Sequence, residues 1–215
     1  MLKNILKNAV VLSFALGSSA ALANTYNFTQ ITSNGNQSVA TQLTAEVTQS
    51  GSNVLFTFKN SSAIASSITD IYFDYGNTSF FSSVSNNVLG SAGDSAGVSF
   101  SDGASPSDLG GPNSYNFTAD ASGDSNSPNI PANGVNASSE YVSFLGTSLT
   151  GVTFANVLAG LDSGAFRLGL HVQSIGGAGS EKFISTTPSA VPLPAAGWLF
   201  GSALVGLMGL SRRKL

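Results

Sequence analysis

The stretch NVLFTFK at residues 53–59 decides the fold, because apolar and polar side chains alternate along it. Val54, Phe56 and Phe58 fall on one face of an extended chain, whereas Thr57 falls on the other. A period of two residues is typical of a strand that buries one face and exposes the other. The sequence therefore predicts a half-buried strand here.

Other segments outside this stretch repeat the alternation. ITDIYFDY (68–75) places Ile71 and Phe73 on one face, and RLGLHVQ (167–173) does the same with its leucines and valine. Clusters of Gly, Asn, Asp, Ser and Pro separate these runs, as turns require. Shorter strand candidates are Tyr26–Ile31, Gln42–Gln49, Val98–Ser101, Ser114–Ala119 and Tyr141–Leu145. In total, seven or eight short strands are expected.

One segment has a helical period instead. Phe154, Val157, Leu158 and Leu161 are spaced at i, i+3, i+4 and i+7, which predicts a short amphipathic helix. Thr153 is the expected N-cap, and Gly164 is the expected stop.

These elements predict an all-β fold, a β-sandwich or jelly-roll-like domain with one short helix. The 14 phenylalanines supply a large core, and the absence of cysteine excludes a disulfide scaffold and thiolate chemistry. The stretch Gly103–Asn136 is polar and rich in turn residues, so surface loops are expected there.

The N-terminal residues 1–23 have the pattern of a secretory signal peptide. Two lysines precede an apolar run, and Ala21 and Ala23 supply the small-x-small pattern that signal peptidase accepts. Cleavage is expected before Asn24. The apolar run is too short for a permanent membrane anchor.

The C-terminal residues carry three features in order. Val191, Pro192, Leu193 and Pro194 form an extended motif, because proline cannot continue a helix. An apolar stretch, 195–210, follows and is long enough for a marginal transmembrane helix. The chain then ends in a basic tail whose charges are expected to stay cytoplasmic: Arg212, Arg213 and Lys214.

This tail resembles the PEP-CTERM sorting signal in its Val-Pro-Leu-Pro-Ala variant. The resemblance implies export through the Sec translocon, a transient stay in the inner membrane and processing at the motif by an exosortase. It also implies a destination at the cell surface or in the extracellular polysaccharide layer. The expected organisation is a signal peptide (1–23), an exported domain (24–184), a linker with the sorting motif (185–194), a transmembrane helix (195–210) and a basic tail (211–215).

Segments of the middle of the chain also resemble an uncharacterised group of PEP-CTERM exported proteins: 68–76, 97–111 and 167–183. The resemblance to that group implies no known activity. Without its two ends the chain keeps only Lys59, Arg167 and Lys182 as cations against all 11 acids. Such an acidic domain argues against nucleic acid as a partner.

Five acids lie close together in the turn-rich segments: Asp94, Asp102, Asp108, Asp120 and Asp124. Calcium prefers such oxygen-rich loops, but none of the spacings matches the known calcium-loop pattern. The favoured interpretation is that these acids solubilise the domain, so no cofactor is predicted, and a calcium site is the alternative. The single histidine, His171, has no nucleophile or carboxylate near it in sequence, so a structural role is predicted.

Six aromatic residues are candidates for a sugar-stacking surface, although most should be core: Tyr72, Tyr75, Phe80, Phe81, Tyr115 and Tyr141. Two functions stay open on these grounds. The first is a non-catalytic, exosortase-processed surface or matrix protein, and the second is a carbohydrate-binding module, with or without calcium. A hydrolase has less support, because no set of nucleophile, base and orienting group is visible in the sequence.

Overall fold

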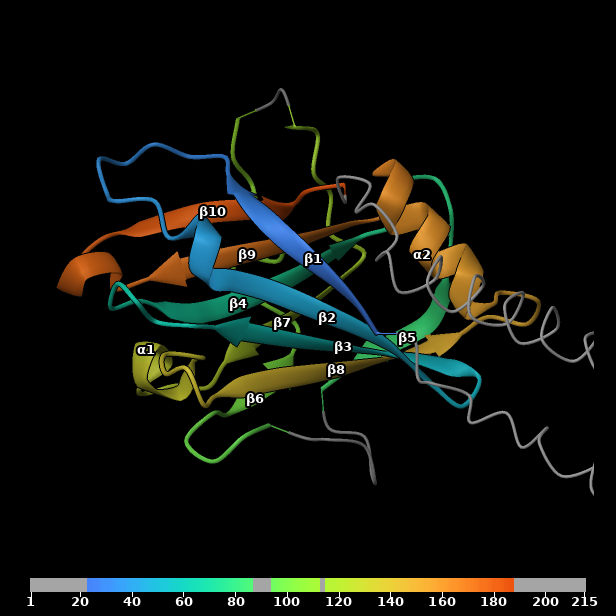
Figure 1. Cartoon of the computed structure of the whole chain (residues 1–215), viewed down its shortest axis with the longest axis horizontal. Coiled ribbons are helices and arrows are strands. Elements are labelled where there is room, and N and C mark those ends of the chain that lie inside the picture. The colour runs from blue at the N-terminus through green and yellow to red at the C-terminus, as the bar shows by residue number, and fades with distance from the viewer. Residues whose placement is uncertain (1–22, 87–93, 113–114, 188–215) are drawn as a thin grey trace, which may run out of the picture.

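The chain folds mainly into antiparallel strands, and a computed structural model describes residues 23–86, 94–112 and 115–187 (Figure 1). Within these ranges ten strands form one sheet in the order β5-β8-β3-β2-β1-β10-β9-β4-β7-β6. The strands are β1 (Ala23–Gln30), β2 (Leu43–Ser50), β3 (Asn53–Asn60), β4 (Ser67–Asp74), β5 (Phe81–Ser85), β6 (Phe100–Asp102), β7 (Ala121–Ser125), β8 (Tyr141–Ser148), β9 (Arg167–Gln173) and β10 (Ser180–Ser185). The helices are α1 (Ile130–Asn133) and α2 (Phe154–Ser163).

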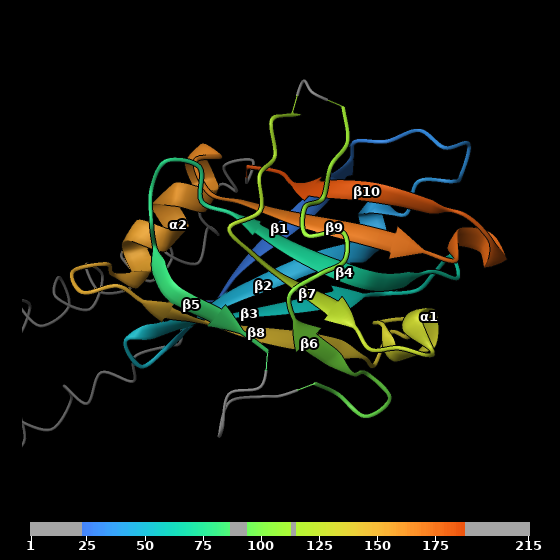
Figure 2. The same ribbon diagram turned by 180° about the vertical axis from the view of Figure 1, so that it is seen from behind.

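The sheet turns back on itself at β1. Residues 23–27 of this strand pair with β2, and residues 28–30 pair with β10. We call β5, β8, β3 and β2 half A, and β10, β9, β4, β7 and β6 half B. The two halves face each other, and the edge strands β5 and β6 approach on the side away from β1 (Figure 2). The expectation of a mostly β fold is thus confirmed.

Aromatic rings fill the space between the halves. Phe58 of β3 packs on Phe73 of β4 with ring centroids 5.9 Å apart, and Phe144 of β8 lies 5.6 Å from the same Phe73 ring. Phe56 and Phe166 extend this cluster through edge-to-face contacts. Burying a ring of this size contributes about 1.5–3 kcal/mol, and edge-to-face pairs add to it. These phenylalanines therefore join half A to half B.

Most of the predicted strands are confirmed. Those expected from the alternating pattern overlap β1, β2, β3, β4, β6, β8 and β9. Strands β5, β7 and β10 were not predicted. The prediction of a strand at Ser114–Ala119 is wrong for residues 115–119, which the structure describes and which pair with no strand.

The predicted helix is confirmed as α2. The Thr153 hydroxyl accepts the Asn156 backbone N–H, and the Asn156 side chain accepts the Thr153 backbone N–H, which makes a capping box. Gly164 ends the helix with a φ of 75°, a left-handed conformation that favours glycine.

A second small core lies on the outer face of half B. Residues 103–112 and 115–119, predicted as polar surface loops, cross this face with Leu109 and Phe117 turned inward. These two side chains sit directly on the backbone of Gly169 in β9, where a Cβ would lie 2.8 Å from each of them. The remaining buried members of this cluster are Ile31, Tyr72 and Ile184.

Both ends of the described chain lie at the α2 end of the molecule. The Tyr26 hydroxyl of β1 donates to Asp162 of α2 at 2.9 Å, and Thr187 lies against Gly164. Helix α1 and the turn between β9 and β10 lie at the opposite end (Figure 1). Among the described residues no helix is long and apolar enough to cross a membrane, and the predicted span at 195–210 lies outside those residues.

Candidate functional site

A row of ionisable side chains crosses the outer face of half B. Asp124 of β7 pairs in register with Asp70 of β4, Asp70 pairs with His171 of β9, and His171 pairs with Lys182 of β10. Directly opposed residues on neighbouring strands project from the same face. The sheet thus brings two acids and two bases side by side, from residues up to 112 positions apart in the chain.

A β-bulge places Asp70 in this row. The register of β4 against β9 shifts between Ile68 and Asp70, so Thr69 is the extra residue. Ile68 and Ile71 therefore both face the core although they are three residues apart, and Asp70 is turned to the outside. The Thr69 hydroxyl donates to Asp70 Oδ2 at 2.9 Å and fixes the carboxylate.

Asp70 orients the histidine. The His171 Nδ1 atom lies 2.7 Å from Asp70 Oδ2, and only 3% of Asp70 is exposed. A carboxylate beside His171 could not be predicted from its sequence neighbours, because Asp70 is 101 residues away along the chain. The spacing of Ile68 and Ile71 was the available signal, since two core-facing residues three apart in a strand require a bulge.

Asp124 carries an altered pKa. Burial first, and then the nearby charge of Asp70 and a hydrogen bond with it, raise the pKa of Asp124 to about 6. The backbone N–H of Ser105, which donates to the same carboxyl group, and the charge of His171 partly oppose this rise. Asp124 therefore exchanges a proton in the pH range in which histidine also titrates.

An ion pair holds segment 115–118 over the same face. Arg167 pairs with Asp74, whose side chain is only 2% exposed, and it donates to the carbonyls of Tyr115 and Asn116. Its guanidinium lies 5.3 Å from the centre of the Phe117 ring. Arg167 thus connects β4, β9 and the covering segment.

A third buried acid organises a turn. Glu181 of β10 accepts the Thr32 hydroxyl at 2.6 Å and the Asn34 backbone N–H at 2.7 Å, with further bonds from Asn36. Burial raises the pKa of Glu181, but these bonds outweigh that effect, and the pKa lies below its usual value. This carboxylate fixes the segment between β1 and β2.

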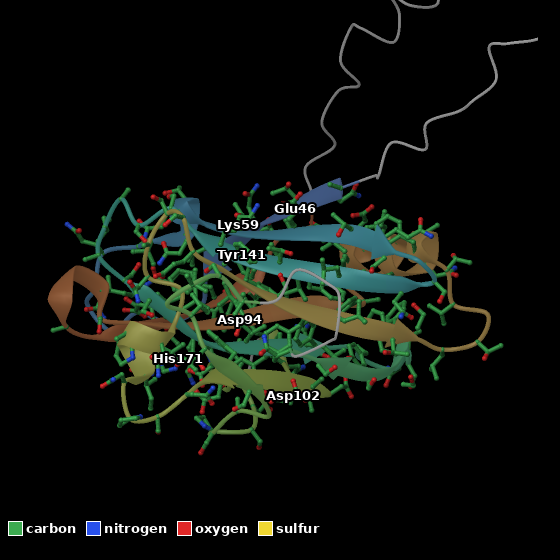
Figure 3. The ribbon with its side chains drawn as sticks, turned by 90° about the horizontal axis from the view of Figure 1, so that it is seen from below. Glu46, Lys59, Asp94, Asp102, Tyr141 and His171 are labelled. Atoms are coloured by element: carbon green, nitrogen blue, oxygen red, sulfur yellow. The ribbon has the colours of Figure 1, made fainter. Side chains whose placement is uncertain are left out.

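The five acids suggested as calcium ligands are distributed over several places. Asp94 and Asp102 both bond to Asn86, Asp124 lies in the row with Asp70, and Asp108 and Asp120 accept backbone N–H groups of Ala119 and Tyr75. In Figure 3 Asp94 and Asp102 lie on the side where β5 meets β6, and Glu46 and Lys59 lie higher, toward half A. Among the described residues no group of three or more His, Asp or Glu side chains could hold a metal ion.

The expectation that most of the six aromatic candidates belong to the core is confirmed for four of them, which are therefore not part of a sugar-stacking surface. The rings of Tyr72, Tyr75, Phe80 and Phe81 are buried, because both faces of β4 are covered and the other rings pack near α2. Tyr115 and Tyr141 remain half-exposed and lie on different halves.

An open groove lies at the α1 end of the molecule. It has a volume of about 570 Å³, and its walls are formed mainly by small and polar side chains, including Ser66, Ser67, Asn136 and Glu140. Asn136 and Ala137 donate their backbone N–H groups to Glu140. The groove thus offers hydroxyl, amide and carboxylate groups on a rigid frame.

No protein-family description, curated protein or solved structure matches the chain. Its chemistry must therefore be inferred from the geometry. Asp124, whose pKa is raised to about 6, lies beside Asp70 in this row, and the adjacent Thr69 hydroxyl donates to Asp70 and to the His171 carbonyl. The described contacts of these groups are those of side chains that stabilise a sheet face. The sorting motif Val191–Pro194, the basic tail Arg212–Lys214 and Ala21 lie outside the described residues, whereas Ala23 and Asn24 begin β1.

Proposed function

We propose that the protein is an exported, exosortase-processed module of the cell surface or extracellular matrix that acts by binding and not by catalysis. One observation carries this proposal: among the described residues the buried core runs from Tyr26 to Ile184. These limits fit between the expected signal cleavage before Asn24 and the expected linker from residue 185. Removal of both targeting segments would therefore leave every described core residue in place.

The arrangement of the ends supports a tethered module. The Thr186 backbone N–H donates to the Asn27 carbonyl at 2.9 Å, so the first and last strands leave the fold side by side at the α2 end. A chain held in the inner membrane through residues 195–210 would present its opposite end, with α1 and the groove, away from the membrane. Processing at Val191–Pro194 would then free the folded unit without opening it.

The roles of the acidic side chains support binding over catalysis. Two acids of half B, Asp70 and Asp74, are engaged by Arg167, His171, Thr69 and a backbone N–H group, which makes these two parts of the scaffold. The face-to-face packing of half A and half B further supports assignment to the β-sandwich class, closed along one side by β1.

The test compares sorting variants in the producing cell. A P192A/P194A variant should remain in the inner membrane at its full length after signal cleavage, because the extended motif is lost. The matched control S189A, in the linker, should be processed and released like the wild type. If P192A/P194A reaches the same cell fraction at the same mass as the wild type, the proposal is wrong.

A second candidate function is carbohydrate binding, and the groove at the α1 end favours it. Its serine, asparagine and glutamate groups are the donors and acceptors that sugar hydroxyls require. Thermal unfolding with a panel of soluble polysaccharides tests this function, since a ligand of the folded state raises the Tm. The Tm increase should be lost in N136A and retained in N77A, a control at the far end. A Tm that no polysaccharide changes would exclude it.

A further inference from the structure

The two edge strands of the sheet meet at a buried asparagine. Asn86 follows β5, and its backbone N–H donates to Asp102 Oδ1, at the end of β6, at 2.7 Å. Its side-chain Nδ2 donates to Asp94 Oδ1, also at 2.7 Å, and Asp94 Oδ2 accepts the Phe100 backbone N–H at 3.1 Å. Two carboxylates are thus held against Asn86, Asp94 by the side chain and Asp102 by the backbone N–H, where β5 and β6 approach each other.

The amide oxygen of Asn86 lacks a partner. Asn86 is 5% exposed, and its Oδ1 is shielded from solvent and accepts no hydrogen bond from the described residues. The orientation of the amide is fixed, because Nδ2 donates to two acceptors, Asp94 Oδ1 and the Ser143 carbonyl. A buried polar atom left unpaired is energetically costly. A bound water or ion is one way in which such an atom is satisfied.

The two carboxylates also lack a counterion. The ion pairs of the described residues are Lys59–Glu46, Arg167–Asp74 and His171–Asp70, and none includes Asp94 or Asp102. The sequence has no lysine or arginine between Lys59 and Arg167. The charge at this place is therefore negative, and the unpaired oxygen belongs to the same amide group whose nitrogen bonds to Asp94.

We infer that Asn86, Asp94 and Asp102 bind a calcium ion that joins β5 to β6. Calcium takes carboxylate and amide oxygens at about 2.3–2.6 Å, and it tolerates irregular sets of ligands that water completes. Zinc prefers nitrogen and sulfur, and magnesium requires near-octahedral geometry. This inference does not depend on the proposed export.

The site has a defined structural consequence. Strands β5 and β6 end the hydrogen-bonded order of the sheet and share no backbone ladder. A cation between Asp94, Asp102 and Asn86 would replace the missing ladder and close the side of the molecule opposite β1. Binding in the range of extracellular calcium modules, with a Kd of roughly 0.1–1 mM, is expected for two carboxylates.

Thermal unfolding of the purified full-length chain tests the site. Relative to EDTA, 5 mM calcium chloride should raise the Tm by about 3–8 °C, and magnesium chloride at equal ionic strength should raise it much less. In D102N the increase should disappear. This change keeps an oxygen that can accept the Asn86 N–H and removes the charge. The matched control D108N, an acid of the same region that bonds elsewhere, should respond like the wild type.

Titration calorimetry gives the second measurement and requires no variant. One calcium ion per wild-type chain supports the site, and the absence of calcium binding overturns it. The inference also fails if D102N retains the wild-type Tm increase, or if D108N loses it. Should D102N not fold, the calorimetric stoichiometry of the wild type decides alone.

Discussion

The strands of half A and half B share the same alternating sequence pattern, but their outer faces differ in how far other residues cover them. On half A the outward side chains of β2 and β3 are partly exposed, and the pair Lys59–Glu46 stands 46% and 36% exposed. On half B all eight residues of β4 are buried, because residues 103–112 and 115–119 cover that face. Alternation in a sequence therefore predicts a strand and its inner face, but it does not predict whether a distant segment covers the outer one.

The largest expected contrast lies in the ion pairs of the two faces. Arg167→Met should lower the free energy of unfolding by about 3–5 kcal/mol, because Asp74 would remain as a buried carboxylate without its partner. Lys59→Met on half A should cost less than about 1 kcal/mol, since its pair is exposed. Urea denaturation of both variants measures the contrast. Equal losses would show that half B is no more covered than half A.

The second contrast concerns apolar side chains. Leu109→Ala should cost about 2–4 kcal/mol, because Leu109 is fully buried in the small outer core. Leu55→Ala, on the outer face of β3, should cost less than about 1.5 kcal/mol, since Leu55 is half-exposed. Limited proteolysis gives an independent readout. New cleavage within residues 103–119 is expected in Leu109→Ala only, and its absence would contradict the covering role of this segment.

A third test concerns the glycine beneath the covering segment. Gly169→Ala should cost about 1–3 kcal/mol, because its Cβ would overlap Leu109 and Phe117. In the double variant with Leu109→Ala, the loss of unfolding free energy should be smaller than the sum of the two single losses, since the smaller side chain relieves the overlap. Strict additivity in chemical denaturation would mean that Leu109 does not rest on Gly169.

The smallest expected effect depends on pH. Because the pKa of Asp124 is raised to about 6 in the folded chain, its ionisation disfavours folding as the pH rises through 6. Asp124→Asn should therefore stabilise the protein by about 1 kcal/mol at pH 8, a value reduced for its partial exposure, and by nothing at pH 4. Denaturation at both pH values checks this. The control Glu46→Gln should show no gain in unfolding free energy at pH 8. An equal stabilisation by Asp124→Asn at pH 4 and pH 8 would contradict a raised pKa of Asp124.

How much of the structure could be predicted from the sequence also differs between half A and half B. The strand that contains Val54, Phe56 and Phe58 could be predicted, because the alternation of its inward-facing apolar side chains is enough to identify it. Strand β7, with the sequence ASGDS, was missed because its residues usually form turns, and it is a strand here because it pairs with β4 and β6. The link between Asp70 and His171 depends on a bulge and on the register of distant strands, which no local pattern specifies.

The calcium candidates illustrate the same limit. The sequence singled out Asp94 and Asp102 among five acids, but it offered no means of separating them from Asp108 and Asp120. What separates them is Asn86, a residue with no sequence signal, whose position between β5 and β6 follows from closure of the sheet.

The intact mass of the protein recovered from the membrane, matrix and medium fractions of the producing cell tests the central claim most directly. We expect a chain that begins at Asn24, ends within Val191–Pro194 and lies outside the inner membrane. A chain that still contains residues 195–215 and is confined to the inner membrane would contradict the claim that the module is processed and released.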